Sequence, residues 1–201
     1  LGLVSDRFGR RPVLALSQWG SAVGYLLLGL ATQPQFHFPP GVTLLLVYVS
    51  RVLDAFTGGN ISTAQAYVSD VTTPETRARG MAMLGAAFGV GFVLGPMTGG
   101  ILGHFSTSLP AYVAMLMAAG AGLFSWLRLP ESRVRAPVED EVWLHPGRFA
   151  PVLRKPVLVQ LLAISFFTMA AFVMMESTSA LFFDAVFGWS KLQIGLYFCY
   201  L

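Results

Sequence analysis

The stretch GLVSDRFGRRPVL, residues 2–14, decides more about this chain than any other part of its sequence. It gathers Asp6 and three arginines within six residues, and residues 12–50, which follow, hold no Asp, Glu, Lys or Arg. Gly9 stands among the charges, and a glycine permits the tight turn of a chain that re-enters a bilayer. At such an edge the acid and the arginines can pair with one another or with helix ends. The stretch is therefore typical of a short loop at a membrane surface.

The composition of the whole chain agrees with this interpretation. Hydrophobic residues make up 55% of the 201 residues and charged residues 11%, whereas soluble proteins have about 25% charged residues. The mean hydropathy is +0.65. A second charge-free run covers residues 80–127, and the one cysteine, Cys199, excludes a disulfide framework. These features exclude a soluble domain and indicate a polytopic membrane protein.

Because about 20 apolar residues in a helix cross the hydrocarbon core, five stretches are long enough to span a bilayer. They lack the alternation of membrane β-barrel strands. Residues 192–201 form a sixth apolar run of about half the required length, and the chain starts at Leu1 without a methionine. We therefore expect a fragment with an all-α transmembrane fold, five complete membrane helices and a truncated sixth. The five complete spans are Val13–Ala31, Val42–Ala66, Gly80–Gly103, Leu109–Leu127 and Val157–Phe183.

The positions of the basic residues predict the orientation of the spans. Three, two and six basic residues lie in the connections 1–12, 67–79 and 128–156, so eleven of the 13 lysines and arginines stand on one side. The positive-inside rule places these three connections in the cytoplasm. This asymmetry also accounts for the sequence pI of about 9.3 without any nucleic-acid partner.

Three motifs resemble the major facilitator superfamily of transporters. Residues 2–11 are similar to its G-x-L-x-D-R-x-G-R-[RK] loop between membrane helices 2 and 3, with Val4 in place of the usual leucine. Residues 91–100, GFVLGPMTGG, match the G-x-x-x-G-P-x-x-G-G pattern of helix 5 that is associated with the antiporters of this superfamily. The sequence LPES at residues 129–132, after helix 6, is a further feature common in the family. The chain most resembles the drug:proton antiporters, in particular their tetracycline-efflux-like branch.

The resemblance implies a domain organisation. Residues 1–127 would be part of the N-terminal bundle, from the end of helix 2 through helix 6. Residues 128–156 would form a cytoplasmic linker between two bundles, and residues 157–201 would begin the C-terminal bundle with helix 7 and the start of helix 8. Arg51 would then correspond to the arginine of helix 4 in this family.

The resemblance also implies two groups of functional residues. In the gating loop, the counterpart of Arg10 pairs with an acid at the cytoplasmic end of helix 4, where Asp70 stands in this sequence. A simple positive-inside anchor is the alternative for Arg7 and Arg11. The gating group comprises Gly2, Asp6, Arg7, Gly9, Arg10, Arg11 and Asp70. The helix 5 group comprises Gly91, Gly95, Pro96, Gly99 and Gly100, where the glycines allow close helix approach and the proline should bend the helix.

Charged residues inside a span cost on the order of 2.5–3.5 kcal/mol each, and they are therefore candidates for a transport pathway. Asp54, Ser62 and Gln65 fall on the same helical face as Arg51 and should look into the bundle or a water-filled cavity. A structural ion pair between Arg51 and Asp54 is the alternative. Glu176 has no basic residue one turn away and is a candidate for proton exchange, although it could also lie near an outer mouth.

We expect the complete protein to be a secondary transporter, a proton-coupled antiporter that exports amphipathic drug-like compounds of the tetracycline or multidrug kind. A symporter or uniporter that imports a nutrient, and a membrane sensor that moves nothing, are the alternatives. The sequence contains neither an H-E-x-x-H nor a G-x-S-x-G motif, so no enzyme is indicated by these signatures. We expect no cofactor and no metal, with the proton gradient as the energy source. The expected partners are a small-molecule substrate, protons and the lipid bilayer of the plasma membrane. We expect the full-length protein to be a monomer.

Overall fold

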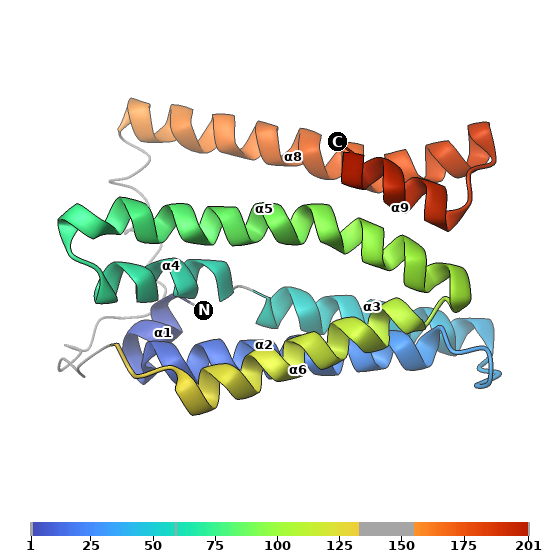
Figure 1. The fold of residues 1–201 in the computed structure, drawn as a ribbon, viewed down its shortest axis with the longest axis horizontal. Coiled ribbons are helices and arrows are strands. Elements are labelled where there is room, and N and C mark those ends of the chain that lie inside the picture. Colours follow the sequence, from blue (N-terminus) through green and yellow to red (C-terminus); the bar gives the residue numbers. More distant parts are fainter. Residues whose placement is uncertain (1, 59, 133–154, 201) are drawn as a thin grey trace. The chain divides into compact units, whose positions relative to one another are not determined.

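A computed structural model describes residues 2–58, 60–132 and 155–200, and within this part of the chain the secondary structure is helical, without strands. This confirms the predicted all-α fold. The helices, shown in Figure 1, are α1 (Gly2–Phe8), α2 (Arg10–Ala31), α3 (Pro40–Thr57), α4 (Asn60–Val71), α5 (Pro74–Phe105), α6 (Leu109–Arg128), α8 (Pro156–Phe187) and α9 (Lys191–Tyr200).

The chain divides into two compact units. One holds α1 to α6 together with α9, and the other holds α8. The five spans predicted from the sequence reappear as segments long and apolar enough to cross a membrane, among the residues that the structure describes. The predicted linker, residues 128–156, lies largely outside the described residues, so the predicted bundle boundaries remain predictions.

Helix α2 is the centre of the first unit, and it packs against α1, α3, α4 and α6. Small residues make these approaches possible. A Cβ at Gly24 would lie 3.2 Å from the carbonyl oxygen of Ser50, so α2 and α3 lie backbone to backbone there. A Cβ at Gly122 of α6 would lie 3.1 Å from the Trp19 ring of α2. Close packing through small residues is the usual way in which membrane helices associate.

The span predicted as Val42–Ala66 is divided in two, which corrects the expectation of one continuous helix there. Helix α3 ends at Thr57 and α4 begins at Asn60. The Gly58 amide donates to the Asp54 carbonyl at 2.5 Å and closes α3. The physical reason is Gly58, which follows the last residue of α3, because glycine is among the weakest helix formers.

Helix α5 extends six residues further toward its N-terminus than the predicted span, which began at Gly80. Thr73 caps it, in a reciprocal arrangement with Thr76, and Pro74 occupies the first helical position. Both are strong helix-start signals. The C-terminal part of α5 turns away from the line of its N-terminal part (Figure 1), which agrees with the bend expected at Pro96.

Candidate functional site

Arg10 lies at the first position of α2, and only 8% of its surface is exposed. Its Nη1 is 2.7 Å from Asp6 Oδ1, and its Nε is 3.0 Å from Asp70 Oδ2. Nη1 also donates a hydrogen bond of 2.6 Å to Ser5 Oγ. A buried charge is tolerated when charged and polar partners surround it in this way. The contact predicted between Arg10 and Asp70 is present, while its part in transport remains a prediction.

The local fold explains how these groups meet. Helix α1 ends at Phe8, and α2 starts after the single residue Gly9. Asp6 and Arg10 thus keep the spacing of one helical turn across this junction. Helix α1 also packs against α4, near whose end Asp70 stands. Two carboxylates from different helices therefore converge on one guanidinium.

Glu131, after the end of α6, is a member of this cluster to which the sequence analysis assigned no role. Its Oε1 accepts a hydrogen bond of 2.8 Å from the Arg10 amide, and its Oε2 accepts one of 3.2 Å from the Arg11 amide. These amides lie at the N-terminus of α2, where amides lack partners within the helix and the helix dipole favours an anion. We call Asp6, Arg10, Asp70 and Glu131 the charged cluster.

Gly9 is required where the chain passes Glu131. Its φ of 100° is a backbone conformation that residues with a side chain rarely adopt. A Cβ at this position would also lie 2.6 Å from Glu131 Oε2. The glycine of the sequence motif thus serves both the turn and the close approach of the carboxylate.

Two further hydrogen bonds connect α4 to the segment that follows α6. Ser132 Oγ donates to Asp70 Oδ2 at 3.3 Å, and the Tyr67 hydroxyl donates to the Pro130 carbonyl at 3.1 Å. The ends of three helices, α2, α4 and α6, therefore meet at the charged cluster.

The side chains of Arg7 and Arg11 each approach an aromatic ring. The Arg7 guanidinium carbon is 5.7 Å from the centre of the Phe8 ring. Arg11 donates to the Trp126 carbonyl of α6, and its guanidinium carbon lies 5.6 Å from the Trp126 ring. These contacts suit side chains that anchor helices at a membrane surface.

Inside the spans, Arg51 of α3 approaches α2. Its guanidinium carbon lies 5.9 Å from the ring centre of Tyr25, a residue that the sequence analysis did not single out. Asp54 lies against the same helix, since a Cβ at Gly24 would be 3.6 Å from its Cβ. Within the described residues no ion pair joins Arg51 to Asp54. A cation over an aromatic face is a further way to stabilise a charge at membrane depth.

The remaining predicted pathway residues all have exposed side chains. Ser62 and Gln65 belong to α4 of the first unit, and Glu176 belongs to α8 of the second unit. Polar side chains on apolar spans are expected to face a cavity or further helices rather than lipid. Their roles remain predictions.

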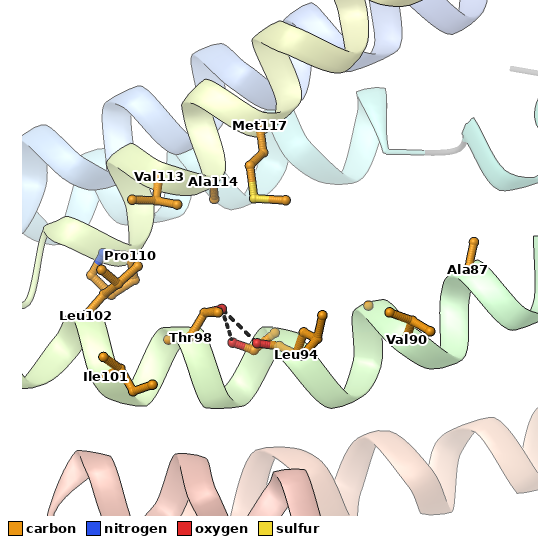
Figure 2. Close-up of a pocket in the computed structure, with 13 residues that line it drawn as sticks. Ala87, Val90, Leu94, Thr98, Ile101, Leu102, Pro110, Val113, Ala114 and Met117 are labelled. Carbon is orange, nitrogen blue, oxygen red and sulfur yellow. Dashed lines mark hydrogen bonds between the residues drawn. The ribbon is translucent and has the colours of Figure 1, made fainter.

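A groove with a volume of about 660 Å³ runs between α5 and α6. Gly91, Gly95 and Gly99 of the helix 5 motif line its floor. Thr98 is its one hydroxyl residue, and this hydroxyl donates back to the carbonyls of Leu94 and Gly95 within α5. The groove is therefore apolar. Figure 2 shows its labelled residues, which are Ala87, Val90, Leu94, Thr98, Ile101 and Leu102 of α5 and Pro110, Val113, Ala114 and Met117 of α6.

Gly100, the last residue of the same motif, faces a different helix. A Cβ at Gly100 would lie 2.9 Å from the Cα of Gly195 in α9. A Cβ at Gly195 would lie 2.6 Å from the Pro96 carbonyl oxygen. The glycines of α5 thus serve two faces, one toward the groove and one toward α9.

Across the three described ranges, no group of three or more His, Cys, Asp or Glu residues is placed to hold a metal ion.

Among the described residues, helices that are long and apolar enough to cross a membrane identify a multi-pass helical membrane protein. A model of the Major Facilitator Superfamily matches residues 1–201. The chain belongs to the Major Facilitator Superfamily.

Its similarity to particular proteins confirms the predicted branch. It is 31% identical over 198 residues to the class C tetracycline resistance protein of Escherichia coli, covering 98% of this chain and 48% of that protein. It is 33% identical over 164 residues to the mouse major facilitator superfamily domain-containing protein 10, covering 82% of this chain and 33% of that protein. The crystal structure of the human organic anion transporter MFSD10 (TETRAN) matches 99% of this chain and 49% of its own, with a TM-score of 0.70 and 30% identity. The chain thus spans about half the length of the class C protein and of the human transporter.

Proposed function

We propose that the complete protein is a proton-coupled antiporter that exports amphipathic drug-like compounds of the tetracycline kind. The observation that carries this proposal is the similarity to a tetracycline resistance protein along 98% of the chain. The glycine motif of α5, which is associated with antiporters, supports the same direction of transport. The protein would work as a monomer in the plasma membrane, with residues 1–12, 67–79 and 128–156 on the cytoplasmic side.

The charged cluster would act as a gate at the cytoplasmic ends of the helices. In one arrangement of an alternating-access cycle the ends of α2, α4 and α6 are held together, and in the other they separate. Ion pairs that are partly buried suit this task, because they stabilise the closed arrangement only while both partners stay in place. The pair of Arg10 and Asp70 would thus favour the outward-facing state.

Proton coupling would use carboxylates at membrane depth. Asp54 lies one turn from Arg51, and in the described structure Arg51 is over the Tyr25 ring. The spacing of one helical turn is what supports a positioning role for Asp54 toward Arg51. Glu176, on an apolar helix without basic neighbours in its sequence vicinity, is the stronger candidate for a carboxyl that gains and loses a proton.

A second candidate function is the transport of an organic anion. The human relative is described as an organic anion transporter and has the same fold over 99% of this chain. The exposed cation of Arg51 within a span would attract an anionic substrate. In this case the substrate, rather than Asp54, would neutralise Arg51 during the cycle.

Uptake into inside-out vesicles that bear the complete protein separates the two functions. Tetracycline uptake that depends on an imposed proton gradient, and that an organic anion such as p-aminohippurate does not inhibit, supports the first. Uptake of the organic anion that Arg51→Gln abolishes supports the second. If neither compound moves above the level of vesicles without the protein, both proposals are wrong.

A further inference from the structure

We propose that Glu131 is a positioning residue of the transport cycle, which fixes the first turn of α2 and thereby holds the Arg10 guanidinium between its two carboxylates. This inference rests on the proposed transport function, which it deepens. It concerns the segment after α6, to which the sequence analysis assigned no mechanism.

The geometry begins with the two oxygens of Glu131. Each accepts a different amide at the start of α2, from Arg10 at 2.8 Å and from Arg11 at 3.2 Å. A carboxylate that accepts two backbone amides at a helix N-terminus makes charge-assisted hydrogen bonds and also interacts favourably with the helix dipole. Glu131 therefore fixes the position and direction of the first turn of α2.

Arg10 is thus held by its main chain and by its side chain at once. Glu131 binds its amide, while Asp6 and Asp70 bind its guanidinium at 2.7 Å and 3.0 Å. A shift of the main chain at Arg10 would carry its guanidinium away from Asp70. The hydrogen bond from the Arg10 amide to Glu131 opposes that shift.

Asp70 is connected to the same segment by the neighbouring residue. Ser132 Oγ donates to Asp70 Oδ2 at 3.3 Å, next to the guanidinium contact of that oxygen. Two consecutive residues, Glu131 and Ser132, hold the two partners of one ion pair. A displacement of these two residues would therefore act on both partners together.

The closest variant is Glu131→Gln, which keeps the size of the side chain and one acceptor oxygen but removes the charge. The matched control is Glu75→Gln, because Glu75 is an exposed carboxylate in the first turn of α5. Ser5 supplies a direct reporter, since it is fully buried beside Arg10. The substitution Ser5→Cys, in a Cys199→Ser background, places a thiol there that reacts with maleimide only when the cluster opens.

The experiment measures tetracycline transport and maleimide labelling in inside-out vesicles of the complete protein. We expect Glu131→Gln to lower the maximum rate about tenfold with KM unchanged, which is the effect of losing one charge-assisted hydrogen bond. We expect it to raise the labelling rate of the thiol at position 5 by about the same factor, whereas Glu75→Gln changes neither. The double variant Glu131→Gln with Asp70→Asn should change the labelling rate by less than the product of the two single effects.

The inference is wrong if the thiol at position 5 is labelled at the parental rate in Glu131→Gln. It is equally wrong if the effects of Glu131→Gln and Asp70→Asn on the labelling rate simply multiply, without coupling. It is also wrong if the melting temperature falls while KM and the maximum rate stay parental, because Glu131 would then only stabilise the fold. If the parent moves no tetracycline, the proposed function fails, and the labelling rates alone decide the role of Glu131.

Discussion

Replacing Asp70 by asparagine should weaken the charged cluster by an amount that the structure allows us to estimate. The change removes one charge from a contact of 3.0 Å with a guanidinium whose side chain is 10% exposed. Removal of one partner from a fully buried pair costs about 3–5 kcal/mol. Two features reduce this value here, because the Asp70 side chain is 30% exposed and Arg10 keeps Asp6 at 2.7 Å. We expect about 1.5 kcal/mol, which is about tenfold in the balance between closed and open arrangements.

The assay is a double-mutant cycle on transport with Arg10→Gln and Asp70→Asn. Each single variant should lower the rate of tetracycline export, and the double variant should lose less than the sum of the two effects. The charge swap Arg10→Asp with Asp70→Arg should restore only part of the activity, because the new carboxylate at position 10 would lie beside Asp6. A coupling energy indistinguishable from zero would show that the contact between Arg10 and Asp70 contributes nothing to the transport cycle.

Three further predictions follow from single positions. Gly9→Ala should lower the free energy of unfolding by about 1–3 kcal/mol, because φ is 100° there; thermal unfolding in detergent checks this, with Gly120→Ala as a control that meets no atom within 4 Å. Gly100→Ala should separate α5 from α9 and reduce transport more than Gly120→Ala does; equal rates would show that the close approach is unimportant. Single cysteines at Thr73 and Gln35, in a background without the native cysteine, should react with an impermeant maleimide from opposite sides of the membrane, and labelling of both from one side would contradict the topology.

The sequence was sufficient to predict the class of fold. Helix spans are set by the length of apolar runs, which is a local property, and α2, α6 and α8 match their predicted spans closely. The end of α3 at Thr57 was missed because apolar length alone does not reveal where a glycine such as Gly58 ends a helix. The earlier start of α5 was signalled by Thr73 and Pro74, which lie in the polar connection rather than in the apolar run.

The charged cluster was predictable only in part. Arg10 and Asp70 came from a resemblance to a family motif, since 60 residues separate them and no periodicity relates them. Glu131 lies 121 residues from Arg10, and its role depends on how α6 ends beside the start of α2. Tyr25 was missed for a similar reason, because a tyrosine in an apolar span gives no signal until another helix brings a cation to its ring.

Proton-coupled antiport is tested most directly by measuring whether tetracycline triggers proton release in inside-out vesicles that bear the complete protein. The parent should release protons when tetracycline is added, whereas Glu176→Gln should still bind tetracycline but release none. Proton release by Glu176→Gln at the parental level, together with export of tetracycline against a gradient, would contradict the proton-exchange role of Glu176.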